Sequence, residues 1–385
     1  MTELAVSRDV RSDPIAKTVE RLRALSRRGL ASMYRRDRRL FGFTVRRRGD
    51  RNELEGVSRR YTAITLIGLA RDDAGAAAGI LAGAKPRAVW DGLAAGADDD
   101  TNLGDVALTL WSGVALGCTH LDGIVRRLTH LDPVGGSHPT VEVAWALTAL
   151  TVDTDFHAQH EGLARRIADR LLASFSPDSG LFPHWPVGAG RSWLRGHVAC
   201  FADVVYPTQA LSHYFARTSD DQALAAAQTC ADHAVGHQGP GGQWWWHFDV
   251  RTGRVVEGYP VYSVHQDAMA PMALLAVQGA SGRDYSRAIA RGVQWLLDPP
   301  ELADRSGGAD AALVDDRASL IWRKVSRREP NKLARSMQAL ASRIHPAARM
   351  PGVNTLMPPQ RIDFECRPYH LGWLLYAWSD HKPDS

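Results

Sequence analysis

The residues most suited to chemistry in this sequence lie between positions 241 and 277. Three consecutive tryptophans, 244–246, stand near the start of this segment, and His265 and Asp267 directly precede an apolar run near its end. A carboxylate at the start of a helix accepts hydrogen bonds from the first N–H groups and lies at the positive end of the helix. Asp267 is therefore expected either to be a simple helix cap or, with its aromatic and histidine neighbours, to carry out acid or base chemistry.

The aromatic content suits a cleft that binds a sugar ring or an apolar ligand. The chain of 385 residues has twelve tryptophans against nine tyrosines and nine phenylalanines, and tryptophan faces often line clefts for sugar rings or apolar ligands. Breaking a glycosidic bond needs a proton donor and a base or nucleophile. We expect Asp267 to be one of these groups, and Asp203 or Glu142, in competition with Asp249, to be the other. His265 is a further proton-transfer candidate, which would suit an epimerase or a lyase.

Other residues would hold the substrate. Tryptophans would stack on sugar faces, and Arg60 or Arg367 would bind a substrate carboxylate through two parallel hydrogen bonds. The candidates for substrate binding are Trp244, Trp246, Asp249, Tyr206, Tyr262, Arg60, Tyr61, His138, Trp185, Arg367 and His370, with Trp193 as a further stacking residue.

The elements that follow these residues have to bring them together. About six times, the sequence repeats a unit in which a polar and aromatic loop leads into an apolar helix that has an amphipathic helix as its partner. Repeats of this kind form arrays of helical hairpins, in which the helices that are apolar on all sides make the inner layer. We predict an all-α fold, an (α/α)6 toroid, whose closure gathers the loops before the inner helices at one mouth. An open solenoid is the structural alternative.

The whole chain, 1–385, is expected to be a single toroid domain with residues 1–13 as a tail. Thr252 and Gly253, which stand between two β-prone runs, predict a short β-hairpin inserted near 243–262. The amphipathic stretch 331–344 is expected to be the helix that covers the last apolar helix of the chain.

Composition and charge narrow the possible functions. Hydrophobic residues make up 45% of the chain and charged residues 23%, as in soluble globular proteins. The formal net charge is +4, and the arginine-rich stretch 35–51 lacks the aromatic platform of a single-strand binder, so no nucleic-acid partner is expected.

The four cysteines form no CxxC pair and no phosphate-cradling glycine loop is present, so neither a metal nor another cofactor is expected. Without an apolar run that could be a signal peptide or a membrane span, a cytoplasmic location is expected.

The repeat architecture, over about residues 15–380, resembles the α/α-toroid superfamilies. In the six-hairpin glycosidase-like group, unsaturated glucuronyl and rhamnogalacturonyl hydrolases have a catalytic aspartate ahead of an inner helix, in a D-D-x-x-M-x-x-P context. The stretch 266–271, QDAMAP, is similar, with Gln266 in place of the first aspartate and a shorter spacing to methionine and proline. The resemblance implies a glycoside hydrolase-like enzyme, or a lyase or an epimerase, with Asp267 at its centre.

A more distant resemblance is to the terpenoid cyclases, whose class II members carry a D-x-D-D motif. The stretch 264–267, VHQD, has the last of these acids, Asp267. This resemblance implies an alternative function, a cyclase in which an aspartic acid protonates an alkene and aromatic faces stabilise cations. A third possibility is a non-catalytic toroid that binds a glycan or a protein. In the leading hypothesis the partner is a small-molecule or oligosaccharide substrate, and the oligomeric state stays open.

Overall fold

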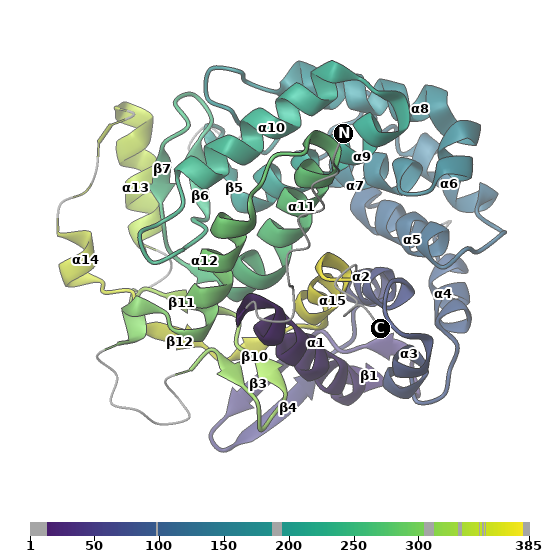
Figure 1. Ribbon diagram of the computed structural model, residues 1–385, viewed down its shortest axis with the longest axis horizontal. Coiled ribbons are helices and arrows are strands. Elements are labelled where there is room, and N and C mark those ends of the chain that lie inside the picture. Colours follow the sequence, from purple (N-terminus) through teal and green to yellow (C-terminus); the bar gives the residue numbers. More distant parts are fainter. Residues whose placement is uncertain are drawn as a thin grey trace, which may run out of the picture.

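Six inner helices form a closed ring in the computed structural model, which describes residues 14–97, 99–186, 195–303, 312–329, 333–345, 347–348, 350 and 352–379 (Figure 1). The inner helices are α2 (Arg59–Ala70), α5 (Leu103–Ala115), α7 (Thr140–Thr151), α9 (Phe201–Thr218), α11 (Ala270–Ser281) and α15 (Pro368–Ala377). Each packs against the next one, and α15 packs against both α11 and α2, so the ring closes. The predicted α/α toroid is confirmed, and the open solenoid is excluded.

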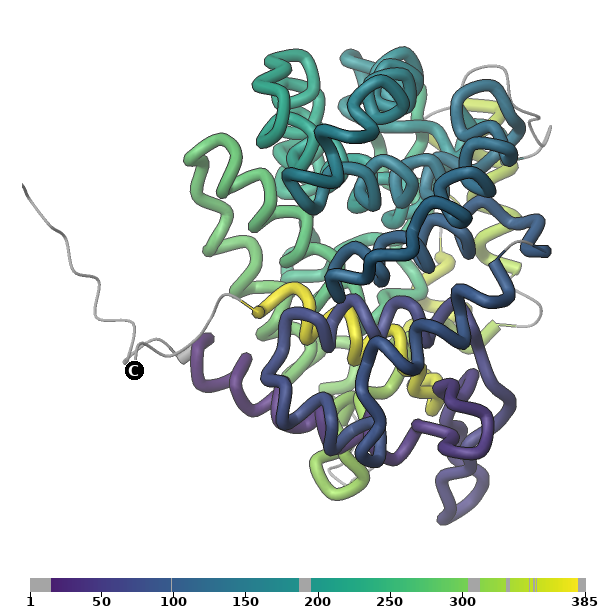
Figure 2. Tube along the Cα trace, turned by 90° about the vertical axis from the view of Figure 1, so that its right-hand side faces the viewer, coloured from purple at the N-terminus to yellow at the C-terminus, as the bar shows by residue number. Residues whose placement is uncertain are grey.

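A second layer of helices covers the ring from outside. It consists of α1 (Pro14–Met33), α3 (Ala74–Ile80), α4 (Pro86–Ala94), α6 (Asp122–His130), α8 (Thr154–Ser174), α10 (Asp221–Gly236) and α12 (Ser286–Leu297). Eleven of the twelve residues of α7 are buried, whereas α6 buries Ile124 and Leu128, which are one turn apart. An inner helix therefore needs apolar residues on all sides, and an outer helix needs one apolar stripe. Figure 2 shows α1 beside α15, although they stand at opposite ends of the chain.

The centre of the ring is a packed core rather than a pore. The fully buried rings of Trp111 and Trp373 have centroids 5.3 Å apart, and the ring of Tyr376 meets both of them edge-on. The side-chain amide of Gln209 donates a hydrogen bond of 2.9 Å to the Tyr376 hydroxyl, which satisfies this buried phenol. Because these side chains fill the middle, a ligand has to bind at an end of the ring.

Short strands gather at the amino ends of the inner helices. β4 (Arg51–Glu55) precedes α2, β5 (Val198–Cys200) precedes α9, β8 (Val261–Tyr262) precedes the π-helical turn η2 (His265–Met269) that leads into α11, and β13 (Glu365–Cys366) precedes α15. Three antiparallel sheets contain these strands, in the orders β4-β3-β13, β5-β6-β7 and β8-β11-β12. The other strands are β1 (Tyr34–Arg35), β2 (Leu40–Phe41), β3 (Thr44–Arg48), β6 (His247–Asp249), β7 (Val255–Glu257), β9 (Val314–Asp315), β10 (Leu320–Ile321), β11 (Lys324–Ser326) and β12 (Arg361–Asp363). The strands thus form a rim around one end of the ring.

The predicted β-hairpin is present as β6 and β7. Gly253 has a φ of +73°, in the left-handed region that favours glycine, and its N–H donates a hydrogen bond of 2.8 Å to the Asp249 carbonyl. The stretch predicted as a helix at 331–344 forms α13 (Leu333–Ile344), but α13 packs against β7. The helix that covers the last inner helix, α15, is α1 rather than α13. The short helices η3 (Pro300–Leu302) and α14 (Val353–Leu356) complete the described elements.

Two sequence-based expectations, the tail 1–13 and Trp193, lie outside the described residues. Among the helices that are described, none combines the length and the apolar character needed to cross a bilayer.

Candidate active site

A cavity of about 290 Å³ opens at the amino ends of the inner helices. We call it the central cavity. Four of the six inner helices, α2, α7, α9 and α15, contribute to it, together with β8, η2 and the loop residues Trp246 and Arg323. Its lining is formed by Arg60, Tyr61, Ile64, Val141, Trp145, Ala202, Tyr206, Trp246, Tyr262, His265, Met269, Arg323 and Tyr369. Six of the residues proposed from the sequence therefore meet in one place, namely Arg60, Tyr61, Tyr206, Trp246, Tyr262 and His265.

Aromatic rings make most of the cavity wall. Tyr61 lies 4.8 Å from Tyr369 between ring centroids, and Trp246 lies 4.8 Å from Tyr262. The ring of Trp145, which also lines the cavity, meets Tyr206 edge-on. Burial raises the pKa of the Tyr206 and Tyr369 phenols, so both stay protonated and can donate hydrogen bonds at neutral pH. Ring faces with hydroxyl groups at their edges suit a ligand that is both apolar and polar, as a sugar is.

A histidine–aspartate pair lies at the start of α9, where Ala202 lines the cavity, although neither His184 nor Asp203 is part of the lining itself. Asp203 is fully buried, and it accepts a hydrogen bond of 2.8 Å from the Cys200 N–H, which caps the helix. Nδ1 of His184 lies 3.1 Å from both carboxylate oxygens of Asp203. This hydrogen bond is the main reason why the pKa of His184 is raised. The His184 side chain is 43% exposed, so the outer part of the imidazole is open to solvent.

Glu142, at the start of α7, belongs to a second polar network. It accepts hydrogen bonds from Asn102 Nδ2 at 3.1 Å and from the Gly104 N–H at 3.3 Å. Arg60 donates to the side-chain oxygen of Asn102 at 2.7 Å and to Asp105 at 2.5 Å. A Cβ atom on Gly104 would lie only 2.9 Å from Glu142 Cγ, so glycine is what lets this carboxylate approach the start of α5.

Asp267 lies outside the cavity lining. His265 and Met269 line the cavity, whereas Asp267 between them has no exposed surface. Both of its oxygens face Nε2 of His370, at 2.8 and 2.9 Å, and the His370 side chain is 4% exposed. The indole N–H of Trp378 donates to the Asp267 carbonyl at 2.7 Å. This pair therefore joins the start of α11 to α15 inside the protein.

His265 combines a place in the cavity wall with deep burial. Its side chain packs against Phe201 and Tyr262, and its Nδ1 atom is buried without a hydrogen-bond partner. Burial lowers the pKa of His265 to about 3, so the imidazole is neutral over the physiological range. A neutral ring can still exchange hydrogen bonds with a ligand.

The other predicted residues are engaged elsewhere. Asp249 is buried in the β6–β7 hairpin and binds the Arg251 guanidinium at 2.6 Å, and Trp244 stacks on Phe201 inside the protein. Nε2 of His138 lies 2.6 Å from the Leu131 carbonyl in its own loop. Arg367 donates to the Tyr61 hydroxyl at 2.8 Å behind the cavity wall, and Trp185 meets His184 edge-on.

Four further residues of this region, Trp145, His184, Arg323 and Tyr369, were not among the site residues predicted from the sequence. Tyr369 and Trp145 lie in the first two turns of the inner helices α15 and α7. Because the starts of both helices were predicted, the aromatic residues in these turns could have been recognised as cavity residues. Arg323 stands between β10 and β11, and no local pattern predicts the pairing of β11 with β8 that brings it to the cavity.

Among the described residues, one group of side chains could hold a metal ion. Donor atoms of His184, Cys200 and Asp203 all lie within 4.8 Å of one another. Histidine, thiolate and carboxylate ligands suit zinc, with a fourth position left open. Without an ion, burial and Asp203 keep the pKa of the Cys200 thiol well above its usual value, so the thiol stays protonated.

Comparisons with known proteins agree with the fold. No protein-family model matches the chain, and no curated protein matches it. Among solved structures, the chain is similar to a glycosyl hydrolase of family 88 from Bacteroides vulgatus, with a TM-score of 0.53, 10% identity, and coverage of 94% of this chain and 98% of that one. A wild-type glycosidase is similar with a TM-score of 0.50, 12% identity, and coverage of 94% and 96%. This protein therefore has the α/α-toroid fold of the six-hairpin glycosidase-like proteins.

Proposed function

We propose that this protein is a carbohydrate-active enzyme that cleaves a glycoside in the central cavity by general acid–base chemistry. The observation that carries the proposal is the cavity itself, where aromatic faces and two guanidinium groups meet beside buried carboxylates. The glycosyl hydrolase and the glycosidase with the same fold support it by analogy alone, because one fold can host several chemistries.

The acid and the base in this proposal are His184 and Glu142. Protonated His184, with Nδ1 held by Asp203, gives its Nε2 proton to the glycosidic oxygen as the C–O bond breaks. Glu142 takes a proton from the water whose oxygen bonds to the anomeric carbon. The raised pKa of His184 favours the protonated form that this step needs.

Asp267 has a different role in this proposal from the one expected at first. Because His370 faces both of its oxygens inside the protein, we assign Asp267 as a positioning residue. It fixes the start of α11 and thereby His265 and Met269, which line the cavity.

Substrate binding is assigned to the cavity wall. Trp246, Tyr61 and Tyr369 would stack on sugar faces, since offset ring contacts stabilise such complexes. Arg60 and Arg323 would bind a carboxylate if the sugar is a uronic acid, because a guanidinium matches a carboxylate with two parallel hydrogen bonds.

The cyclase alternative has less support. The acid that would protonate an alkene, Asp267, is sealed from the cavity, and Arg60 and Arg323 would destabilise a carbocation in the same space. A non-catalytic glycan-binding toroid remains a distinct hypothesis, because it predicts ligand binding without turnover.

The proposal is tested by incubating the protein with a panel of neutral and uronic-acid oligosaccharides and measuring release of new reducing ends. We expect turnover of at least one substrate, and we expect Glu142→Gln to lower kcat by about 10²- to 10⁴-fold with an unchanged circular-dichroism spectrum. Glu161→Gln, an exposed change on α8, is the matched control. Binding without any turnover would favour the glycan-binding toroid, and wild-type activity in Glu142→Gln would remove Glu142 from the mechanism.

A further inference from the structure

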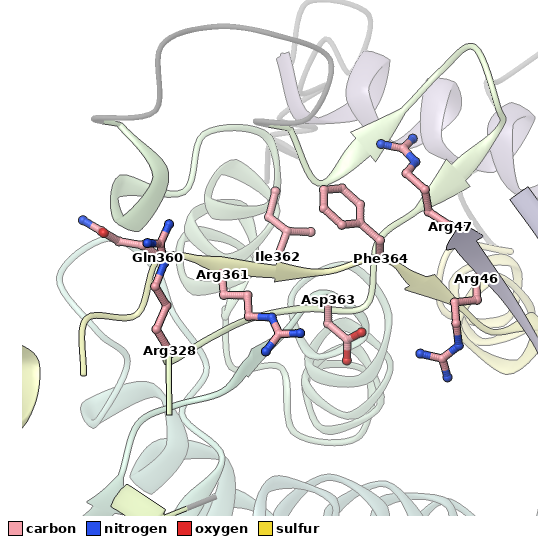
Figure 3. Close-up of a pocket in the computed structure, with 8 residues that line it drawn as sticks. All are labelled: Arg46, Arg47, Arg328, Gln360, Arg361, Ile362, Asp363 and Phe364. Atoms are coloured by element: carbon pink, nitrogen blue, oxygen red, sulfur yellow. The ribbon is translucent and has the colours of Figure 1, made fainter. Parts of the chain in front are cut away.

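A larger hollow adjoins the central cavity and shares part of its wall. It has a volume of about 630 Å³, and Trp246, Tyr262 and Arg323 line both spaces. A third hollow of about 340 Å³ shares Arg46, Arg361 and Asp363 with the second (Figure 3). We call the second and third hollows together the basic groove. The three hollows are therefore neighbours, arranged from the ring centre toward the outer part of the β rim.

The sheet β8-β11-β12 turns its polar face to this groove. Lys324 pairs with both Tyr262 and Asp363, and Ser326 pairs with Arg361. The residues that alternate with them, including Val325 and Ile362, are buried in the core. In Figure 3, Arg361 and Asp363 extend to one side of β12 and Ile362 to the other.

Positive charge dominates the groove. Its lining includes eight arginine or lysine side chains against three carboxylates. The cations are Arg46, Arg47, Arg323, Lys324, Arg327, Arg328, Arg335 and Arg361, and the carboxylates are Glu329, Asp363 and Glu365. Several of the cations are paired. Arg323 binds Glu365 at 2.9 Å, Lys324 binds Asp363 at 3.1 Å, and Arg327 binds Glu257 from outside the lining at 2.9 Å.

Three groove arginines, Arg328, Arg335 and Arg361, have no carboxylate within ion-pair distance among the described residues. Arg335 is the most informative, because it is 8% exposed and its Nε atom is buried without a hydrogen-bond partner. Its guanidinium lies 4.7 Å from the Trp246 ring centroid, at the junction of the groove and the central cavity. A buried cation without a counterion is unfavourable unless a ligand supplies the anion.

We infer that the substrate is a polyanionic oligosaccharide, with carboxylate or sulfate groups on successive sugars that bind along the basic groove. Arg335 binds the anionic group of the sugar next to the one in the central cavity. Arg361 and Arg328 bind the groups further out. This inference rests on the proposed function and adds to it a substrate with charge on more than one sugar. Trp246, shared by both spaces, is the stacking face between the two positions.

The first test is equilibrium binding, followed by tryptophan fluorescence, with oligogalacturonates of two to six sugars. We expect affinity to rise with chain length and to fall at high salt, because exposed charges are screened. The carboxyl-reduced, neutral oligosaccharides of the same lengths should bind at least tenfold more weakly. Equal binding of the neutral and acidic series overturns the inference and leaves the proposed hydrolysis standing.

The second test uses variants. Arg335→Gln should weaken binding of every acidic oligomer about tenfold or more, since a charge-assisted pair is lost. Arg361→Gln, at an exposed position that the fold does not need, should weaken only the longer oligomers. Arg287→Gln, an equal charge change on the outer helix α12, should bind as the wild type does. If the Arg335→Gln and Arg361→Gln variants both bind all acidic oligomers as tightly as the wild type, the groove does not recognise the anionic groups and the inference is wrong.

Further experiments distinguish carboxylate from sulfate as the bound anion, and they distinguish the polyanionic substrate from the proposed glycoside cleavage. A sulfated oligosaccharide of the same length tests whether sulfate replaces carboxylate, and tighter binding of either one supports the inference. A single-stranded DNA oligonucleotide that binds as tightly as the acidic sugars would contradict it, because the groove would then be a general polyanion surface. Turnover of neutral substrates alone would keep the proposed function and exclude the polyanionic substrate.

Discussion

Two histidine–aspartate pairs stand at the starts of neighbouring inner helices, and they differ in how far the histidine is exposed. In both, one imidazole nitrogen lies about equally far from two oxygens of a fully buried aspartate, at 3.1 and 3.1 Å for His184 with Asp203 and at 2.8 and 2.9 Å for His370 with Asp267. The His184 side chain is 43% exposed, whereas that of His370 is 4% exposed.

Under the proposed function, this difference gives the two pairs different tasks. A proton can be exchanged with a substrate only from a group that the substrate reaches, so the open pair is suited to catalysis. The sealed pair satisfies two buried polar groups and holds α15 against the start of α11. Equal hydrogen bonding therefore does not imply equal function, and the exposure of the histidine separates the two cases.

The largest effect is expected on activity from the open pair. His184→Ala removes the proposed proton donor, and kcat should fall by about 10²- to 10⁴-fold on any substrate that the wild type turns over. The free energy of unfolding should change little, because His184 is half-exposed. His120→Ala, an exposed histidine outside the site, serves as the control in the same kinetic assay. An active His184→Ala protein would contradict the assignment of this pair.

The sealed pair should instead affect stability. Asp267→Ala leaves His370 buried without its acceptor, and the free energy of unfolding should fall by about 3 kcal/mol, measured by urea denaturation. His370→Ala should have a similar effect, and the double variant should lose less than the sum of the two single losses, because the two residues are coupled. Asp178→Ala, an exposed aspartate, is the control. Additive losses would show that the two residues do not stabilise each other.

Acid should destabilise the protein through its buried neutral histidines. The pKa of His265 is lowered to about 3 from an ordinary value of 6.5, so below pH 6.5 the unfolded chain binds a proton that the folded chain does not. Stability should therefore fall with decreasing pH between 6.5 and about 3, by up to about 1.4 kcal/mol per pH unit for this histidine. Urea titrations at several pH values should show a flatter dependence in His265→Gln, and an unchanged slope would contradict the low pKa.

The smallest expected effect is the contribution of His184 to the pH dependence of stability. Its sign is opposite to that of His265. The pKa of His184 is raised by Asp203, so the pair stabilises the fold fully below the ordinary histidine pKa, and this contribution is lost as pH rises through the raised value. The difference in unfolding free energy between the wild type and His184→Gln should therefore shrink with increasing pH. Because the imidazole is half-exposed, solvent weakens the effect. A difference that grows with pH would contradict the pairing.

The sequence predicted the ring of helices and part of the lining of the central cavity. Runs such as 140–151, apolar on every side, can only be buried between neighbours, and this requirement is enough to indicate an inner layer of helices. Six of the cavity residues come from the segments before these helices and from the first two turns of the helices, Trp246 and Tyr262 among them. The hairpin around Gly253 followed from local turn chemistry.

The remainder of the site depends on contacts that local patterns do not encode. Arg323 reaches the cavity because β11 pairs with β8, about sixty residues earlier in the chain. The direction of Asp267 depends on the π-helical turn η2, which turns His265 and Met269 toward the cavity and Asp267 away from it. The polar residues 265–267 were recognisable as a helix start, but the exposure of their side chains was not predictable from residue types.

The most direct test of this account compares Asp203→Asn with Asp267→Asn, measuring kcat and the free energy of unfolding for each on one substrate. We predict that Asp203→Asn folds and loses kcat by at least about 100-fold, because His184 loses the charge that favours its protonated form. We predict that Asp267→Asn is less stable and that its folded fraction keeps kcat close to the wild-type value. An Asp267→Asn protein with wild-type stability and no activity, beside an active Asp203→Asn protein, would contradict the account.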